Sequence, residues 1–247
     1  MTERTNVNPT IMLVHGAFAD ASSWNGVIER LQQQGYTIVA PPNPLRGVAA
    51  DSAYIASALS QIDGPILLVG HSYGGAVISN AATDAPNVVG LVFVAAFAPD
   101  EGERLGEVSN DSKDSVLNSA LVQRHYPTGG DGGTAVEFAI DPERIREAFA
   151  ADLSEETAAL LAATQRPIAE AAFSDASGPA AWRRLPSWAV VATGDKAAGA
   201  DLVRSMAQRA GADIVEAEGS HVIMVSQPQL VTDVIVKAAR AVADSHR

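Results

Sequence analysis

A serine stands between two glycines in Gly70-His71-Ser72-Tyr73-Gly74, where an apolar stretch ends and a helical pattern begins. The residues match G-x-S-x-G, the turn that presents a nucleophilic serine between a strand and a helix. Glycine is needed because side chains at the flanking positions would collide with the neighbouring strand and helix. A serine hydroxyl alone is a weak nucleophile, so the motif predicts a base elsewhere in the chain. The spacing does not fit G-x-G-x-x-G, which excludes a dinucleotide-binding loop.

His221 is the best placed of five histidines to serve as this base. His246 lies in the tail, His125 in an expected insertion, His71 inside the serine turn and His15 at the end of the first expected strand. His221 follows the last expected strand in the stretch EAEGSHVIM and opens a helix. That position agrees with the chain order serine, acid, histidine found in sites of this kind.

The third member of such a site is a carboxylate that holds the tautomer of the imidazole and offsets the charge it gains. Asp195, in VVATGDK, leaves the expected strand at 188–193 and fits this role. Asp100, in FAPD, follows the expected strand at 88–95 and remains the alternative if the acid lies one strand earlier. Asp201 is expected to cap the following helix.

Acyl transfer also requires hydrogen-bond donors aimed at the oxyanion that forms on the substrate. The amide of Tyr73, directly after the serine, is one expected donor. The loop after the first strand, in His15-Gly16-Ala17, should supply the other, and Ala17 is best placed. Only backbone groups act here, so the expected oxyanion hole consists of the N–H groups of Ala17 and Tyr73.

Short apolar runs alternate with longer amphipathic ones, which predicts a mostly parallel, twisted sheet with helices on both faces. Each expected strand is apolar on both faces, as buried parallel strands are. The expected strands are 10–15, 36–40, 66–69, 88–95, 188–193 and about 213–217. The expected helices are 24–34, 50–61, 74–83, 201–210 and 228–243.

The alternation breaks between about Glu101 and Pro186, where helix signals recur without a convincing strand. We therefore expect a core formed by residues 1–100 and 187–247, and a helical cap inserted at 101–186 over the carboxyl ends of the strands. Helix starts are expected at 141–143 and 154–156, each with a capping residue and an acidic first turn. The glycine-rich segment 129–133, which precedes both helix starts, is expected to be a flexible hinge or edge.

Composition narrows the classes of function. The chain has 247 residues, 47% of them hydrophobic, a net charge of −12 and no cysteine. The acidic balance disfavours nucleic acid and anionic lipid as partners. No apolar stretch approaches the ~20 residues that span a bilayer, and the start MTERTNVNPT lacks the apolar region of a signal peptide, so we expect a cytoplasmic protein. A homodimer is left open.

Taken together, these stretches resemble the α/β-hydrolase fold, and within it the branch of plant methyl-salicylate-type esterases and hydroxynitrile lyases. The matching pieces are LVHGAFADASSW, ILLVGHSYGG, VFVAAFAPDE, VVATGDK and EGSHVIMVSQPQ, in the same order and at similar spacing. The resemblance covers most of the expected core. It implies that Ser72, Asp195 and His221 form a catalytic triad, with Ala17 and Tyr73 at the oxyanion hole and no cofactor or metal.

Two departures from this family matter. An Ile-Pro pair usually follows the acid, whereas Ala197-Ala198-Gly199 follows Lys196 here, so a shorter or more mobile loop is expected. The lyases carry a lysine directly after the catalytic histidine to handle cyanide, and Val222 occupies that position. Because an apolar side chain cannot stabilise a departing anion, cleavage of cyanohydrins is disfavoured.

The function expected from these residues is hydrolysis of a small to medium, neutral and moderately hydrophobic ester through an acyl-enzyme. Phe18, Phe97 and Val222 are the expected pocket residues, and the cap decides which ester fits. Two alternatives stay open. The same triad can support a cofactor-free perhydrolase or haloperoxidase-like reaction, and the same fold can serve as a small-ligand receptor without turnover.

Overall fold

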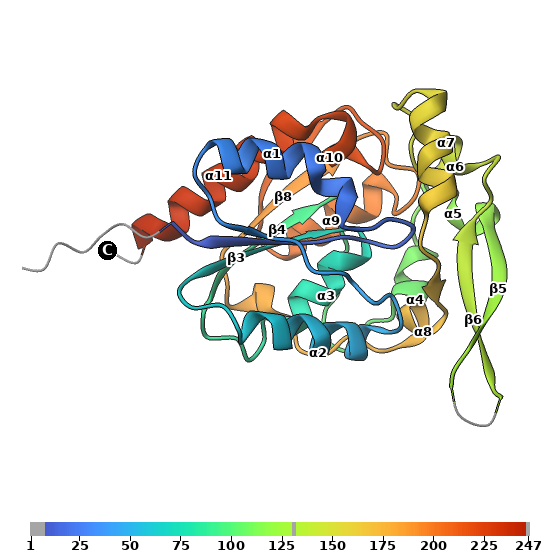
Figure 1. Ribbon diagram of the computed structural model, residues 1–247, viewed down its shortest axis with the longest axis horizontal. Coiled ribbons are helices and arrows are strands. Elements are labelled where there is room, and N and C mark those ends of the chain that lie inside the picture. The colour runs from blue at the N-terminus through green and yellow to red at the C-terminus, as the bar shows by residue number, and fades with distance from the viewer. Residues whose placement is uncertain (1–7, 130–131, 246–247) are drawn as a thin grey trace, which may run out of the picture.

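The computed structural model describes residues 8–129 and 132–245, and its centre is a parallel sheet of six strands (Figure 1). The strand order is β2-β1-β3-β4-β8-β9. β1, β3, β4 and β8 are almost wholly buried, which explains why their sequences are apolar on both faces. The strands are β1 (Thr10–Val14), β2 (Ile38–Val39), β3 (Ile66–His71), β4 (Val88–Val94), β8 (Ser187–Ala192) and β9 (Asp213–Ala217).

Helices cover both faces of this sheet, as Figure 1 shows with the sheet seen nearly edge-on. α1 and α11 pack against each other on one face, and α2 and α3 pack together on the other. The predicted mostly parallel sheet between helices is therefore confirmed. The helices of the core are α1 (Asn25–Gln33), α2 (Val48–Leu59), α3 (Tyr73–Ala81), α9 (Ala200–Arg209), α10 (Ile223–Ser226) and α11 (Pro228–Ser245), with a 3-10 turn η1 at Ala21–Trp24.

The inserted segment forms a separate layer at the carboxyl ends of the strands, at the right of Figure 1. It contains a three-stranded antiparallel sheet in the order β5-β6-β7, so the expectation of a purely helical cap was wrong. Its elements are α4 (Leu105–Ser109), α5 (Leu117–Ala120), β5 (Leu121–Pro127), β6 (Thr134–Ile140), α6 (Ile145–Ala148), α7 (Glu155–Thr164), β7 (Ile168–Ala169), α8 (Ala171–Ser174) and η2 (Ala181–Arg183).

The glycine-rich segment 129–133 connects the two strands of a hairpin, β5 and β6, which pair from Leu121 opposite Ile140 to Pro127 opposite Thr134. The interpretation of this segment as a hinge falls partly on Gly130 and Asp131, which lie outside the described residues. The helix start at 154–156 is confirmed, since the hydroxyl of Ser154 accepts a hydrogen bond from the N–H of Thr157 at 3.2 Å.

Arg46 joins this layer to the core. Its guanidinium lies 2.8 Å from a carboxylate oxygen of Glu137 on β6 and 4.3 Å from the ring centre of Tyr126 on β5. Next to it, the carbonyl of Leu45 accepts a hydrogen bond from the N–H of Ala169 on β7. None of the helices in the part of the chain described here has the length and apolarity that a membrane crossing needs.

Candidate active site

Ser72 occupies the tight turn between β3 and α3, as the motif predicts. Its backbone has φ 52° and ψ −124°, a conformation that costs a non-glycine residue about 1–3 kcal/mol. The glycines on either side permit this turn. A Cβ on Gly70 would lie 2.7 Å from the carbonyl of Gly74, and one on Gly74 would lie 2.5 Å from the carbonyl oxygen of Val14. The surroundings therefore hold the serine in a strained position at the carboxyl edge of the sheet.

The loop after β1 lies directly against this turn. A Cβ on Gly16 would approach the Cβ of Ser72 to 2.6 Å, so only glycine allows this contact. Ala17 and Tyr73 both line the same cavity as Ser72. Their N–H groups donate to no backbone carbonyl among the described residues, whereas the N–H of Phe18 donates to the cap at 3.1 Å. Two unused donors thus lie beside the serine, and their role as an oxyanion hole stays a prediction.

Hydrogen bonds between His15 and Asn43 hold the loop after β1 in place. Nε2 of His15 accepts a hydrogen bond from the N–H of Asn43 at 2.9 Å, so the ring proton lies on Nδ1, which donates to the carbonyl of Gly16 at 2.9 Å. The side-chain amide of Asn43 donates to the carbonyl of His15 at 3.0 Å. Burial lowers the pKa of His15, which keeps the imidazole neutral. Asn43 was not recognised in the sequence, because its partner is distant in the chain.

His221 and Asp195 are hydrogen-bonded and buried. Nδ1 of His221 lies 2.8 Å from Oδ2 of Asp195, and each residue is only 1% exposed. Oδ1 of Asp195 accepts from the N–H groups of Ala197 and Ala198 at 2.9 and 3.0 Å. Both carboxylate oxygens are therefore engaged, which orients the acid toward the imidazole.

The alternative acid, Asp100, lies elsewhere. It is paired with the guanidinium of Arg183, whose side chain is largely exposed, and this hydrogen bond lowers the pKa of Asp100. Asp201 also differs from expectation. The residue at the N-terminal cap of α9 is Gly199, and the carboxylate of Asp201 accepts hydrogen bonds from the hydroxyl of Ser112 and the N–H of Lys113 in the inserted segment. The expected helix cap is therefore wrong.

Two further rings pack against His221. The ring centre of His71 lies 4.8 Å from that of His221, and Nε2 of His71 donates to the carbonyl of His221 at 2.9 Å. Burial and the neighbouring His221 lower the pKa of His71 well below its usual range, so this imidazole is neutral. Phe149 of the inserted layer also packs against it, with its ring centre 5.1 Å from that of His221 and 6.5 Å from that of His71.

A cavity of about 530 Å³ opens over Ser72 and His221, and both residues line it. Phe18 and Phe97 line it as expected. Val222 does not, and it is fully buried in the core at the start of α10, so its expected place in the pocket is wrong. Val222 follows His221 in the sequence, but the chain turns there and directs the valine inward.

The inserted segment supplies most of the remaining cavity wall. Three of its aromatic residues, Phe138, Phe149 and Phe173, line the cavity together with Leu105, Leu117 and Leu121. Polar side chains also contribute, among them Ser109, Asn110, Ser115 and Asn118. Over residues 8–129 and 132–245, no three His, Asp or Glu side chains are grouped as ligands for a metal ion.

The sequence matches the model of the alpha/beta hydrolase family over residues 11–234. The chain belongs to this family. It is similar to the alpha/beta hydrolase nvfD of Aspergillus novofumigatus, with 26% identity over 258 residues that cover 94% of this chain and 97% of the relative. It is also similar to Esterase PIR7B of Oryza sativa subsp. japonica, with 23% identity over 92% of this chain and 94% of that protein.

Among solved structures, polyneuridine aldehyde esterase has a similar fold. Its TM-score is 0.79 at 20% identity, and the match covers 94% of this chain and all of that chain. The resemblance to the α/β-hydrolase fold, first indicated by the motifs, is therefore confirmed.

Proposed function

We propose that this protein hydrolyses a small to medium, neutral and moderately hydrophobic carboxylic ester through an acyl-enzyme on Ser72. The coarser part of this function follows from its family and its esterase relatives: the chain is a carboxylic ester hydrolase. The observation that carries the finer proposal is that Ser72 and His221 line one cavity, and that His221 is hydrogen-bonded to the buried carboxylate of Asp195.

The geometry gives each of these residues a role. Because Nδ1 of His221 faces Asp195, Nε2 is the nitrogen left to accept the proton of Ser72. As Oγ of Ser72 bonds to the ester carbonyl carbon, the unused N–H groups of Ala17 and Tyr73 stabilise the charge on the carbonyl oxygen. The imidazolium then gives its proton to the leaving alcohol. Water, deprotonated by His221, attacks the acyl-enzyme and releases the acid and Ser72.

The substrate class follows from the cavity. Its volume of about 530 Å³ is within the range of small-molecule sites, and aromatic side chains such as Phe18, Phe97 and Phe149 form part of its wall. Such a wall favours a neutral, moderately hydrophobic ester. The net charge of −12 acts in the same direction, because the field of the protein repels anionic substrates.

Hydrolysis of p-nitrophenyl esters of increasing acyl length tests the proposal. We expect turnover by the wild-type protein with an optimum at short to medium chains, and loss of at least about 10³-fold in kcat for Ser72→Ala. Ser79→Ala is the matched control. Ser79 lies in α3, the helix that follows Ser72; it is fully buried and its hydroxyl has no partner among the described residues, so its loss should leave kcat unchanged. Comparable turnover by Ser72→Ala would contradict the proposal.

A further inference from the structure

The orientation of Asp195 depends on the turn that follows it. Oδ1 of Asp195 accepts both N–H groups of this turn, from Ala197 and Ala198, while Oδ2 faces His221. Ala197 and Ala198 are almost fully buried and line the cavity. A displacement of this turn would therefore rotate the carboxylate away from the imidazole.

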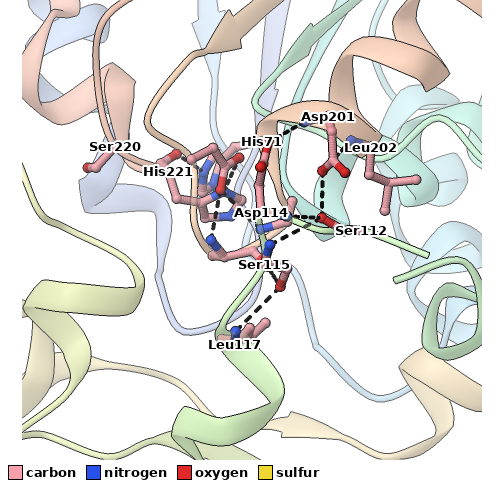
Figure 2. A network of polar contacts seen from close by, with 12 residues as sticks. His71, Ser112, Asp114, Ser115, Leu117, Asp201, Leu202, Ser220 and His221 are labelled. Atoms are coloured by element: carbon pink, nitrogen blue, oxygen red, sulfur yellow. Dashed lines mark hydrogen bonds and ion pairs between the residues drawn. The ribbon is translucent and has the colours of Figure 1, made fainter. Parts of the chain in front are cut away.

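Residues 112–117 of the inserted layer hold this turn from outside (Figure 2). The hydroxyl of Ser115 donates to the carbonyl of Ala197 at 2.6 Å, and the N–H of Val116 donates to the carbonyl of Lys196 at 2.8 Å. Two successive carbonyls of the turn are thus bonded to the cap. Ser115 also lines the cavity, so the residue that is hydrogen-bonded to the turn after Asp195, called here the acid turn, borders the space for the substrate.

A second set of bonds fixes the far end of the turn, at the start of α9. The carboxylate of Asp201 accepts from the hydroxyl of Ser112 at 2.6 Å, and the N–H of Asp201 donates to Asp114 at 3.0 Å (Figure 2). The same carboxylate accepts from the N–H of Lys113 at 2.8 Å. Gly199 has φ +91°, and a Cβ there would overlap the hydroxyl of Ser112. The contact between segment 112–117 and the acid turn is close at both ends.

We propose that Ser115 is a positioning residue for the reaction, acting through Ala197 on the orientation of Asp195. Segment 112–117 is then part of the catalytic apparatus as well as part of the pocket wall. The inference rests on the proposed role of Asp195 as the acid of the triad. It goes beyond that role because it assigns to a residue of the inserted segment a part in orienting the carboxylate of Asp195 in the core.

A double-mutant cycle between Ser115→Ala and Asp195→Asn tests this inference with a p-nitrophenyl ester. In the wild-type background, we expect Ser115→Ala to lower kcat about tenfold with less than about a threefold change in KM, since one buried carbonyl loses its donor and the turn shifts. In the Asp195→Asn background the same change should lower kcat less than about twofold, because no carboxylate remains to be oriented. Ser115→Thr, which keeps a hydroxyl, should restore most of the activity.

Two further variants complete the design. Ser119→Ala is the matched control, because the exposed hydroxyl of Ser119 donates to the carbonyl of Val116 within the cap and does not line the cavity. Its kcat should equal that of the wild type. If Ser115→Ala does not fold, as judged by circular dichroism, Ser112→Ala replaces it in the cycle, with an expected fall of about threefold that again disappears in Asp195→Asn.

The outcomes separate the two proposals. Equal losses of kcat from Ser115→Ala in the wild-type and Asp195→Asn backgrounds would overturn the positioning role. The same conclusion would follow if Asp195→Asn inactivates the protein while Ser115→Ala alone leaves kcat unchanged. An unchanged kcat in Asp195→Asn alone would instead overturn the assignment of Asp195 as the acid.

Discussion

The hydrogen bond between Tyr73 and Asp51 should stabilise the turn that carries the serine, and Tyr73→Phe removes it with little change in packing. The hydroxyl of Tyr73 donates to Oδ2 of Asp51 at 2.7 Å. Asp51, on α2, is fully buried, and its other donors are the N–H groups of Arg46 at 3.0 and 3.1 Å and of Gly47 at 3.4 Å. The tyrosine therefore supplies the shortest of these hydrogen bonds.

The expected magnitude follows from the charge and burial of the acceptor. A hydrogen bond to a charged group contributes about 1.5–3 kcal/mol, so Tyr73→Phe should lower the free energy of unfolding by about that amount at neutral pH. For a chain of this size, the loss corresponds to a fall in Tm of about 3–12 °C. The N–H of Tyr73 belongs to the backbone and stays in place, so kcat should remain within about threefold of the wild type.

The loss should also depend on pH. Burial raises the pKa of Asp51 in the folded protein, and the hydrogen bonds from Tyr73, Arg46 and Gly47 oppose this effect. Because the folded state binds the proton more readily than the unfolded chain, Asp51 makes stability fall as pH rises from its unfolded to its raised folded pKa. Removing the tyrosine hydroxyl raises the folded pKa of Asp51 further. The destabilisation by Tyr73→Phe should therefore be largest near pH 7.5 and decrease toward pH 4.

Urea unfolding followed by tryptophan fluorescence at pH 7.5 and pH 4.0 measures this difference. Tyr54→Phe is the matched control, because Tyr54 lies on the same helix as Asp51 and is 45% exposed. Its free energy of unfolding should stay within about 0.5 kcal/mol of the wild type. A loss for Tyr73→Phe below about 0.5 kcal/mol at pH 7.5, or an equal loss at both pH values, would refute the reasoning.

Two more substitutions test the site. Asp195→Asn should lower kcat about 10⁴-fold, because in either orientation the amide NH₂ faces another donor, which is the imidazole in one case and the backbone in the other. Asp100→Asn breaks the exposed ion pair with Arg183 and should change kcat less than about twofold. Steady-state kinetics of the two variants decide between the two carboxylates, and a larger loss of kcat in Asp100→Asn would assign the acid to Asp100, after β4. Gly74→Ala should lower the free energy of unfolding by about 2 kcal/mol or more in urea, because its Cβ would lie 2.5 Å from the carbonyl oxygen of Val14; unchanged stability would show that the turn relaxes freely.

The core and its site motifs could be predicted because their signals are local. Apolar runs mark strands that are buried on both faces, and the glycines around Ser72 mark a turn with no room for Cβ atoms. The sheet then fixes where these motifs meet, since the carboxyl ends of parallel strands lie at one edge. His221 and Asp195 follow two such strands, so their proximity could be expected before the structure was known.

The cap was harder to predict because its strands lack the apolar pattern of the core. In β5, four of seven residues are polar or proline, since the strand is largely exposed. The signal that could have identified the hairpin is the glycine-rich segment 129–133 between two seven-residue stretches, which was interpreted as a hinge. The hydrogen bonds of Ser112 and Ser115 join residues more than eighty positions apart, and no local pattern indicates them.

The division of the site between the two halves of the chain has a consequence for folding. β4 pairs with β8 across residues 95–186, a connection that includes the whole insertion. Closing so long a loop is entropically costly and slow compared with pairing β1, β3 and β4. During synthesis the strand that carries Ser72 is complete before the segment with Asp195 and His221 exists. Under the roles proposed for these residues, a nascent chain has its serine before its base, and we expect hydrolytic activity to arise only in the last step of folding.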